Sequence, residues 1–437
     1  MKSILFATLL VGCWVLYCAG APPAVKYVVV IDAGSTGNRA AGYKYSISSK
    51  GLLKLEREEM TKNKGGLTTL PDVAEGAAKI AELLTEIKGK LELTDELAAQ
   101  TPVILRGTGG LRKVSKEEAD RILAPVREVI KSSGFLAHGN FAQVLSGTHE
   151  AVFSWFSVNY LLGRWGKKNT VAALDLGGAS TQITTAIVKK NDVSLNNHVF
   201  TVSTPFPKSQ AEVFSTSYMN LGAESVRQAV FTYDNPDGAT ELKTICMHQD
   251  TVPSTIGFGK KTYQVRGIPN DKGQVDFDAC TQLVRDQTLN LVQPRPSPLK
   301  DVKDIYAFSG FFFRFSKPQV GLIDGKKGGK ATVEDILTSA KKVCSVKQDG
   351  APFLCLDLIY MHVLLSEGYG LKPSTNINFQ QTLDGHDVSF TLGVGYDELS
   401  GLKVAEKPVG NDGASGSGKK PSGSGKKPSG SGKKPKH

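Results

Sequence analysis

Apolar runs long enough to cross a membrane are missing from most of this chain. After residue 20 no stretch has the roughly 20 apolar residues that a spanning helix needs, so we predict no transmembrane anchor in the mature protein. The sequence also lacks a recognisable DNA-reading motif, and we expect no specific binding to nucleic acid. The formal charge of +11 does not contradict this expectation. Residues 413–437 hold seven lysines and no acid, so the rest of the chain has a charge of only about +4.

Cysteine is scarce, with 6 in 437 residues, and the sequence has no CxxC pair, no histidine cluster nearby and no Asn-x-Ser/Thr sequon. A zinc site and N-glycosylation are therefore not favoured. Four cysteines remain beyond the first twenty residues: Cys246, Cys280, Cys344 and Cys355. In an oxidising compartment they indicate two disulfides, and sequence alone allows three pairings. We predict Cys246–Cys280 and Cys344–Cys355, the pairing that closes the shortest loops.

The amino terminus has the features of a secretory signal peptide. Lys2 precedes a short apolar run over residues 4–16, and small residues follow at 18–21. This order of a charged start, an apolar stretch and a small-residue exit is typical of a cleaved signal. We predict a signal peptide over residues 1–20 and a mature protein that is secreted or lies in the lumen of the endoplasmic reticulum or Golgi. An uncleaved signal anchor is the alternative.

The carboxyl terminus is a low-complexity repeat. Residues 410–437 repeat the sequence Lys-Lys-Pro-Ser-Gly-Ser-Gly without any recurring apolar residue. Such a composition cannot bury a core, so we predict a disordered tail. Its lysine pairs allow weak binding to anionic surfaces; a solvated tail that only aids solubility is the alternative.

The body of the chain, roughly residues 25–405, is long enough for two domains. Its 40% hydrophobic and 22% charged residues are typical of a soluble globular protein and exclude a mostly disordered or fibrous one. Strand patterns at 26–31, 40–46, 102–106, 170–174 and 181–188 and helix patterns at 72–90, 115–132 and 150–162 predict an α/β fold. The unit of strand, Asp-led glycine-rich turn and strand occurs twice, about 140 residues apart. This repeat predicts an internal duplication with a cleft between two similar halves.

The two glycine-rich turns carry the candidate chemistry. Residues 32–37 read DAGSTG and residues 175–180 read DLGGAS. Glycines let the backbone approach a ligand, and successive N–H groups with nearby hydroxyls can hold phosphate oxygens. An aspartate at each strand end can hold a hydrated divalent cation. Ordinary hairpins are the alternative, but two Asp-led copies favour a site for phosphate and metal.

Five segments then resemble the apyrase motifs of the nucleoside triphosphate diphosphohydrolase (apyrase) family. They are residues 32–39 (DAGSTGNR), 108–112 (TGGLR), 147–150 (GTHE) continued by Trp155 and 159–163, 175–182 (DLGGASTQ) and 391–393 (TLG). The segments 307–312 (AFSGFF) and 368–370 (GYG) also have counterparts. The motifs keep the family's order over about residues 27–395.

The resemblance implies an actin-like fold of two ribonuclease-H-like domains with the nucleotide in the cleft between them. It places residues 25–145 and 388–405 in the N-terminal domain and 146–387 in the C-terminal domain. By matching positions, Asp32 and Asp175 hold Ca²⁺ or Mg²⁺ through water. The residues implied to bind phosphates and base are Gly34, Ser35, Thr36, Gly37, Arg39, Thr108, Gly177, Gly178, Ala179, Phe312 or Phe313, and Tyr369.

The resemblance also implies the reaction. Glu150 matches the residue that activates the attacking water, while Ser180 and Gln182 match residues that place it. We therefore predict hydrolysis of the terminal phosphate of nucleoside di- or triphosphates. Taken alone, Glu150 would be interpreted as a helix-capping residue and residues 311–313 as core. The competing functions are another actin-like phosphotransferase, such as a sugar kinase or polyphosphate phosphatase, and a non-catalytic nucleotide- or glycan-binding protein.

Overall fold

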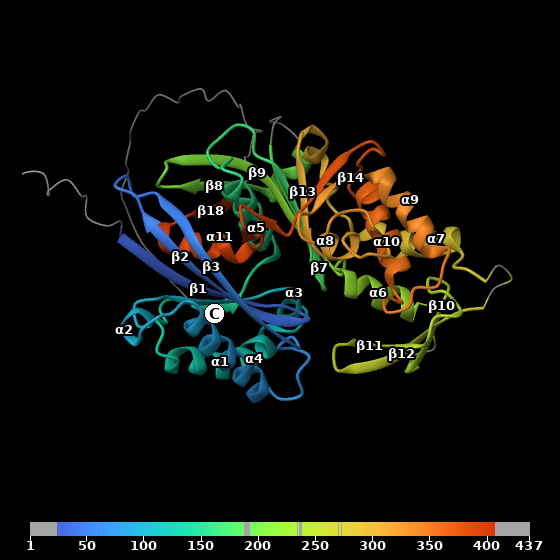
Figure 1. The fold of residues 1–437 in the computed structure, drawn as a ribbon, viewed down its shortest axis with the longest axis horizontal. Coiled ribbons are helices and arrows are strands. Elements are labelled where there is room, and N and C mark those ends of the chain that lie inside the picture. The colour runs from blue at the N-terminus through green and yellow to red at the C-terminus, as the bar shows by residue number, and fades with distance from the viewer. Residues whose placement is uncertain are drawn as a thin grey trace, which may run out of the picture. The chain divides into compact units, whose positions relative to one another are not determined.

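The computed structural model describes residues 24–187, 193–233, 235, 238–269, 271 and 273–406. The predicted signal peptide and repeat tail lie outside these residues. Within them, no helix combines the length and apolar character needed to cross a membrane. The described chain forms two large sheets, each with helices packed on both faces, which is the predicted α/β class (Figure 1).

The first sheet has the strand order β3-β2-β1-β4-β5. Its strands are β1 (Ala24–Ala33), β2 (Gly37–Ile47), β3 (Leu53–Lys64), β4 (Val103–Gly107) and β5 (Ala142–Val144). The second sheet has the order β14-β15-β13-β6-β7-β9-β8-β18. Its strands are β6 (Ala172–Leu176), β7 (Ser180–Ala186), β8 (Val199–Thr204), β9 (Ser209–Met219), β13 (Ile305–Ser309), β14 (Gly329–Thr332), β15 (Asn376–Phe379) and β18 (Lys403–Glu406).

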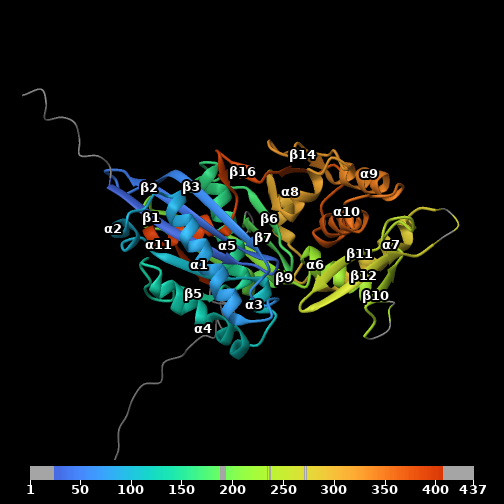
Figure 2. The same cartoon turned by 60° about the horizontal axis from the view of Figure 1, so that its bottom comes forward.

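The helices and the smaller sheets complete the fold. The helices are α1 (Val73–Lys90), α2 (Asp95–Ala98), α3 (Gly109–Arg112), α4 (Lys116–Ser132), α5 (Gly147–Leu161), α6 (Ala223–Thr232), α7 (Phe277–Thr288), α8 (Gly310–Phe315), α9 (Val333–Cys344), α10 (Leu354–Val363) and α11 (Phe390–Ser400). A three-stranded sheet contains β10 (Glu241–Thr244), β11 (Ser254–Phe258) and β12 (Lys261–Gly267), beside α6 and α7 (Figure 2). The short hairpin of β16 (Thr382–Leu383) and β17 (His386–Asp387) precedes α11.

The two large sheets repeat one topology. In the first, β1 pairs antiparallel with β2 and parallel with β4, and β4 pairs parallel with β5. In the second, β6 pairs antiparallel with β7 and parallel with β13, and β13 pairs parallel with β15. The third strand of each antiparallel set is β3 in one sheet and β9 in the other. The predicted duplication is therefore present in the strand order.

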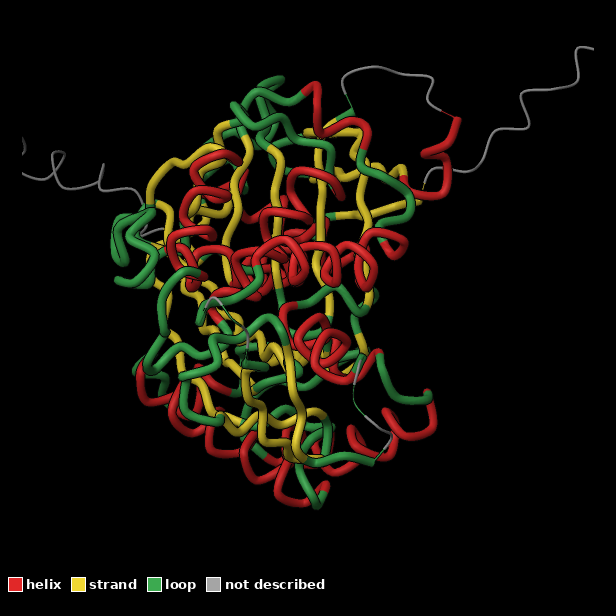
Figure 3. The backbone as a smooth tube through the Cα atoms, turned by 90° about the vertical axis from the view of Figure 1, so that its right-hand side faces the viewer, coloured by secondary structure: helices red, strands yellow, loops and turns green. Residues whose placement is uncertain are grey.

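Alternating side chains of the first strand in each sheet build separate cores. Val29 and Ile31 face a cluster formed with α1 and α4, whereas Val28 and Val30 face a cluster around α5 and α11. In β6, the even-numbered residues join a cluster with α6, α7, α9 and α10, and the odd-numbered Ala173 joins the cluster around α5 and α11. Strands buried on both faces read as continuous apolar runs, as both do here. Helices and strands consequently alternate in layers (Figure 3).

The two lobes exchange a helix. Helix α5 follows the last strand of the first sheet but packs on β6, β7 and β9, whereas α11 lies between β15 and β18 of the second sheet in the sequence and packs on β1 and α5. Gly393 permits this crossing, because a Cβ there would lie 2.6 Å from the carbonyl oxygen of Phe153. The starts of α5 and α11 both lie beside a cavity, because Glu150, Ser389 and Phe390 line it.

Some boundaries differ from the prediction. Residues 403–405 were expected in the N-terminal domain, but β18 pairs with β8 in the second sheet, where its backbone completes the edge. Strand β3 was not predicted, because most of its residues are charged or polar, which an edge strand tolerates. Pro125 does not divide α4, since Ile122 and Val126 hold both halves against the core.

The predicted disulfide pairing is confirmed. Cys246 is bonded to Cys280 and Cys344 to Cys355. The first bridge ties β10's end to α7, and the second ties the end of α9 to the start of α10. Both bridges lie in the lobe that contains the eight-stranded sheet, which we call the larger lobe. They link the helices α7, α9 and α10 that pack on this sheet.

Candidate active site

The two glycine-rich turns have the same backbone geometry. The N–H of Gly34 donates to the carbonyl of Gly37 over 3.0 Å, and the N–H of Gly177 donates to the carbonyl of Ser180 over the same distance. A Cβ at Gly34 or Gly177 would lie 3.0 or 3.1 Å from the same carbonyl oxygen that closes its turn. A side chain would therefore be tight against the backbone at equivalent places in both lobes, which favours glycine there.

Each turn leaves backbone donors available. In the part of the chain that the structure describes, the N–H groups of Ser35, Thr36, Gly178 and Ala179 have no acceptor. All four residues line the cleft. Unpaired backbone N–H groups that converge on one cavity form a binding site for an anion.

The second turn is held from behind by α6. The N–H groups of Ala223 and Glu224 donate to the carbonyls of Gly177 and Gly178 over 2.9 and 3.0 Å, and Ser225 Oγ donates to the carbonyl of Ala179 over 3.2 Å. These bonds satisfy donors at the start of α6. They pair the carbonyls of the turn, while among the described residues the N–H groups of Gly178 and Ala179 stay without an acceptor.

The cleft is a cavity of about 610 Å³ between the lobes. It brings together most of the predicted site residues, namely Asp32, Gly34, Ser35, Thr36, Gly37, Arg39, Thr108, Glu150, Asp175, Gly177, Gly178, Ala179, Ser180 and Phe313. Its lining does not include Gln182, Phe312 or Tyr369, which lie deeper.

Asp32 and Asp175 face the cavity from opposite lobes. Burial raises the pKa of each carboxyl to about 7, and the charges of neighbouring carboxylates, including Glu150, add to the effect. Thr108 Oγ1 donates to Asp32 over 3.3 Å, and Ser154 Oγ donates to Asp175 over 3.4 Å. Buried carboxylates that repel one another across a cavity fit a cation. Among the described residues, no three acidic, histidine or cysteine side chains converge to bind a metal directly.

Glu150 is not the capping residue of its helix. Ser146 caps α5 by accepting from the N–H of His149, and the structure begins this helix at Gly147, three residues before the predicted start. The carboxylate of Glu150 instead accepts from Arg112 Nη1 over 2.7 Å. Burial raises the pKa of Glu150, and the charge of Arg112 opposes this rise. The carboxylate thus stays directed at the cleft.

The predicted site set omitted Arg112, although this residue ends the second motif and contacts two predicted site residues. Its Nη1 also donates to the carbonyl of Leu145 over 2.9 Å, and its Nη2 donates to Ser180 Oγ over 2.9 Å. One guanidinium from the first lobe therefore orients both Glu150 and Ser180. The motif TGGLR contained this signal, because a buried arginine requires acceptors.

Gln182 lies behind Ser180 rather than at the cavity surface. Its Nε2 donates to Ser180 Oγ over 2.7 Å and to Ser217 Oγ over 3.0 Å, and it is 3.5 Å from Glu150 Oε2. The residue is 1% exposed. It can position Ser180 and Glu150, but in this conformation it does not meet the cavity.

The aromatic residues predicted to bind the base lie in different environments. Phe313 is 47% exposed and lines the cavity. Phe312 is buried in the core of the larger lobe, and Tyr369 is buried there with its hydroxyl 3.3 Å from Thr181 Oγ1. Of these three rings only Phe313 lines the cleft, because helix α8 turns Phe312 into the core. Stacking of a base on Tyr369 and Phe312 or Phe313 stays a prediction.

The cleft has further charged residues that the sequence did not single out. They are Lys62, Lys64, Glu224 and Arg314, with Ser309 and Ser389 beside them. The two lysines were missed because β3 was not predicted. Ser309 has a left-handed φ of +54°, and its N–H donates to Gln381 Oε1 over 3.0 Å. Such strain in a non-glycine residue is typical of a functional site.

These features define a class: a two-lobed actin-like α/β protein with an anion-binding cleft and a buried carboxylate set. Residues 21–410 match the GDA1/CD39 (nucleoside phosphatase) family. The chain belongs to this family of enzymes, as the five motifs predict.

Its relatives cover most of its length. It is 30% identical over 388 residues to ectonucleoside triphosphate diphosphohydrolase 5 of Gallus gallus, with 86% of this chain and 88% of that protein covered. It is 29% identical over 399 residues to ectonucleoside triphosphate diphosphohydrolase 6 of Homo sapiens, with 88% and 79% covered. A solved structure of nucleoside triphosphate hydrolases from Neospora caninum shares the fold, with a TM-score of 0.58, 16% identity and coverage of 86% and 92%.

Proposed function

We propose that this nucleoside phosphatase hydrolyses the terminal phosphoanhydride of nucleoside di- and triphosphates with a water activated by Glu150. The observation that carries the proposal is the pair of matched turns: the four residues with unpaired N–H groups line the same cavity as Glu150. The oxygen of water attacks the terminal phosphorus, and the bond to the bridging oxygen breaks. Glu150 accepts a proton from the water, and the shortened nucleotide leaves with inorganic phosphate.

Each group of residues in the cleft has its own role in this proposed reaction. The N–H groups of Ser35, Thr36, Gly178 and Ala179 hold phosphate oxygens, and Arg39 adds positive charge at the wall. Such fixed donors stabilise the charge that develops on the transferring group. Ser180, oriented by Arg112 and Gln182, helps to place the water. Phe313 offers an exposed ring on which a base can stack.

Asp32 and Asp175 would hold a divalent cation through its water shell. Ca²⁺ and Mg²⁺ both prefer oxygen ligands, and the two carboxylates supply these from opposite walls. When bound, such a cation neutralises phosphate charge. The carboxylates themselves keep the charge of the cleft balanced against Arg39 and Arg112.

The secretory pathway is the proposed location. The predicted signal peptide at 1–20 and the two disulfides support it, because disulfides persist in oxidising compartments. Weak binding of the repeat tail to anionic surfaces remains part of the same proposal.

The substitution Glu150→Gln tests the base. Glutamine keeps the size and can still accept from Arg112, but it cannot take the proton. We expect kcat to fall by at least about 10²-fold, because a positioned general base contributes about 10²–10⁴. Thermal stability should stay near the wild-type value. Phosphate release from ADP, UDP, GDP and ATP is the measurement.

Glu75→Gln is the matched control, because Glu75 is an exposed acid in the first turn of α1. It loses the same helix-dipole interaction, worth about 1 kcal/mol or less, and should keep normal turnover. Normal turnover in Glu150→Gln would refute this base. Release of phosphate from tripolyphosphate but from no nucleotide would favour a polyphosphate phosphatase, and no release at all would favour a binding protein.

A further inference from the structure

Arg314 is a cleft residue with an unusual support. It follows Phe313 on α8, lines the same cavity and has a side chain that is 20% exposed. Its Nε donates to Asp357 Oδ2 over 3.1 Å. Asp357 lies on α10, and its side chain is 3% exposed. The guanidinium at the cleft wall is therefore anchored to a buried carboxylate behind it.

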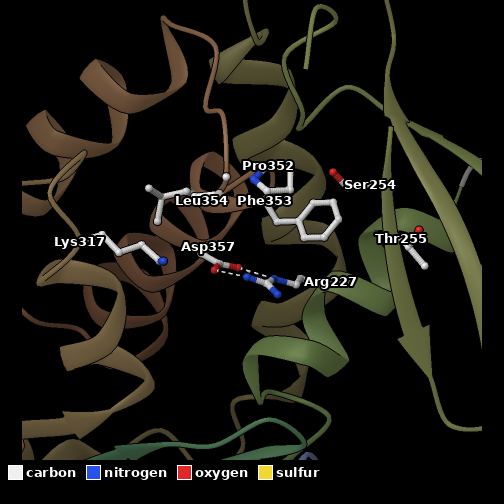
Figure 4. A pocket seen from close by; sticks show the side chains of 10 residues that line it. Arg227, Ser254, Thr255, Lys317, Pro352, Phe353, Leu354 and Asp357 are labelled. Atoms are coloured by element: carbon white, nitrogen blue, oxygen red, sulfur yellow. Dashed lines mark hydrogen bonds and ion pairs between the residues drawn. The ribbon is translucent and has the colours of Figure 1, made fainter. Parts of the chain in front are cut away.

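A second arginine fixes that carboxylate from the other side. Arg227 of α6 donates through Nε to Asp357 Oδ1 over 2.7 Å and through Nη2 to Oδ2. The guanidinium of Arg227 also lies 5.2 Å from the ring centre of Phe353. Figure 4 shows Arg227 and Asp357 paired beside this ring, in a separate cavity of about 410 Å³. The disulfide at Cys355 holds the start of α10 two residues before Asp357.

The two arginines differ in the donors that they have left. Arg227 uses two of its nitrogens on Asp357 and stacks on Phe353, so its guanidinium is committed to the fold. Arg314 uses only Nε, and among the described residues neither of its Nη groups has an acceptor. Those Nη groups are not buried atoms. An arginine with a fixed Nε and two open Nη groups presents a planar fork of donors to a ligand.

The position of Arg314 indicates which part of the substrate its two open Nη groups bind. The transferring phosphoryl group belongs near Glu150 and Ser180, where Arg112 already supplies the guanidinium. Arg314 is a neighbour of Phe313, the exposed ring in the cleft. We infer that Arg314 binds the nucleoside monophosphate portion of the substrate, with Asp357 and Arg227 as its positioning residues. This inference rests on the proposed hydrolysis and adds a residue that sets how tightly the leaving nucleotide is held.

Inhibition by each of the two products tests binding at each end of the substrate separately. The probes are inorganic phosphate and the monophosphate formed from the best substrate among UDP, GDP and ADP. For Arg314→Met we expect KM and the inhibition constant of the monophosphate to rise about tenfold. The inhibition constant of phosphate and kcat should stay within about threefold. Arg314→Lys should not restore affinity, because one ammonium cannot both bond Asp357 and present a fork.

Arg285→Met is the matched control. Arg285 also donates through Nε to a carboxylate, that of Glu367, but it lies outside the cleft. It should leave both inhibition constants unchanged. Unchanged monophosphate inhibition in Arg314→Met overturns the inference, as does an equal rise for phosphate or full rescue by lysine. If Arg314→Met fails to fold, the same measurement on Arg314→Lys decides. A wild-type chain that releases no phosphate from any nucleotide would instead refute the proposed function.

Discussion

The ion pair of Arg112 and Glu150 determines how the proposed base titrates. Burial alone would raise the pKa of Glu150, and the guanidinium 2.7 Å away pulls it back. A base must be ionised to accept a proton, so activity falls as pH drops through this pKa. The arginine therefore both aims the carboxylate and extends the acidic range in which it works.

The substitution Arg112→Met should move the acidic limb of kcat/KM to higher pH. An opposite charge at this distance lowers a carboxyl pKa by about 1–3 units, so we expect a shift of about one unit or more. Arg121→Met is the control, because Arg121 pairs with Glu118 on the surface. A pH–rate profile of each variant is the measurement, and an unmoved limb would contradict the role given to Arg112.

Glu58 is a buried acid outside the proposed chemistry. Its Oε2 accepts from the N–H of Asp387 over 2.7 Å, and its Oε1 is buried without a partner among the described residues. Burial raises its pKa to about 7; the hydrogen bond from the N–H of Asp387 opposes this rise, and the charge of the Asp387 carboxylate adds to it. Because this value lies above that of the unfolded chain, the folded state holds the proton more tightly. Stability should fall as pH rises from about 4.5 to 7.

The substitution Glu58→Gln should remove that fall. The amide still accepts from Asp387 but has no proton to lose, so the variant should lack a loss of up to roughly 3 kcal/mol across this window. Urea unfolding midpoints at pH 5 and pH 8 measure the difference. Parallel pH dependence in wild type and variant would show that Glu58 ionises normally.

Single residues were predictable where a motif fixes the backbone. The turn glycines, Asp32, Asp175 and Glu150 all reached the cleft because each is placed by a strand end or a helix start. The aromatic residues were not, since three consecutive phenylalanines on a helix point in different directions and only tertiary packing selects one.

At the level of elements, the hydrogen bonds from the start of α6 hold the second glycine-rich turn in place. Gly222 caps α6 with an ordinary φ of −75°, so alanine is allowed by the backbone. Its added Cβ, however, would lie 2.3 Å from the carbonyl carbon of Gly178. The turn must move to make room, although no ligand-facing atom has been changed.

Gly222→Ala should therefore lower kcat by at least about tenfold, since a misplacement of about 1 Å can cost about 10²-fold. Gly89→Ala in α1 is the control, because a Cβ there meets nothing within 4 Å. It should keep activity and raise stability by about 0.5–1 kcal/mol. Steady-state kinetics and thermal melts decide, and full turnover in Gly222→Ala would mean that the turn tolerates displacement.

Elements with a strong pattern were predicted well, and those without one were not. Helix α1 begins after Asp72 and ends at Lys90, as its apolar period and cap predict. Strand β3 carries mostly polar residues at a sheet edge, so its pairing with β2 is a tertiary property. The start of α5 was misplaced because Ser146, rather than Glu150, is the cap.

At the level of the whole molecule, the carboxylates that would hold a cation come from different lobes. Asp32 ends β1 and Asp175 lies in β6. A cation held by both neutralises two buried charges and links the lobes. We expect excess chelator to abolish phosphate release and added Mg²⁺ or Ca²⁺ to restore it. The melting temperature should rise with added cation, and Asp175→Ala should lose that rise. Full activity in chelator would refute the metal assignment.

The duplication was predictable because both copies keep the sequence of their turn. The exchange of α5 and α11 between lobes was not, because nothing local in either helix records which sheet it covers. Likewise β18 joins the second sheet through backbone pairing with β8, which its side chains do not reveal.

The placement of α11 has a consequence for synthesis on the ribosome. By the time both turns, Glu150 and all four bridged cysteines have been translated, β1 still lacks the helix that covers its inner face. Ser389 and Phe390, which line the cleft, are made only with the start of that helix. The nascent chain thus carries both turns and Glu150 while one lobe is unfinished, and the cleft is complete only once one of the last helices has been made.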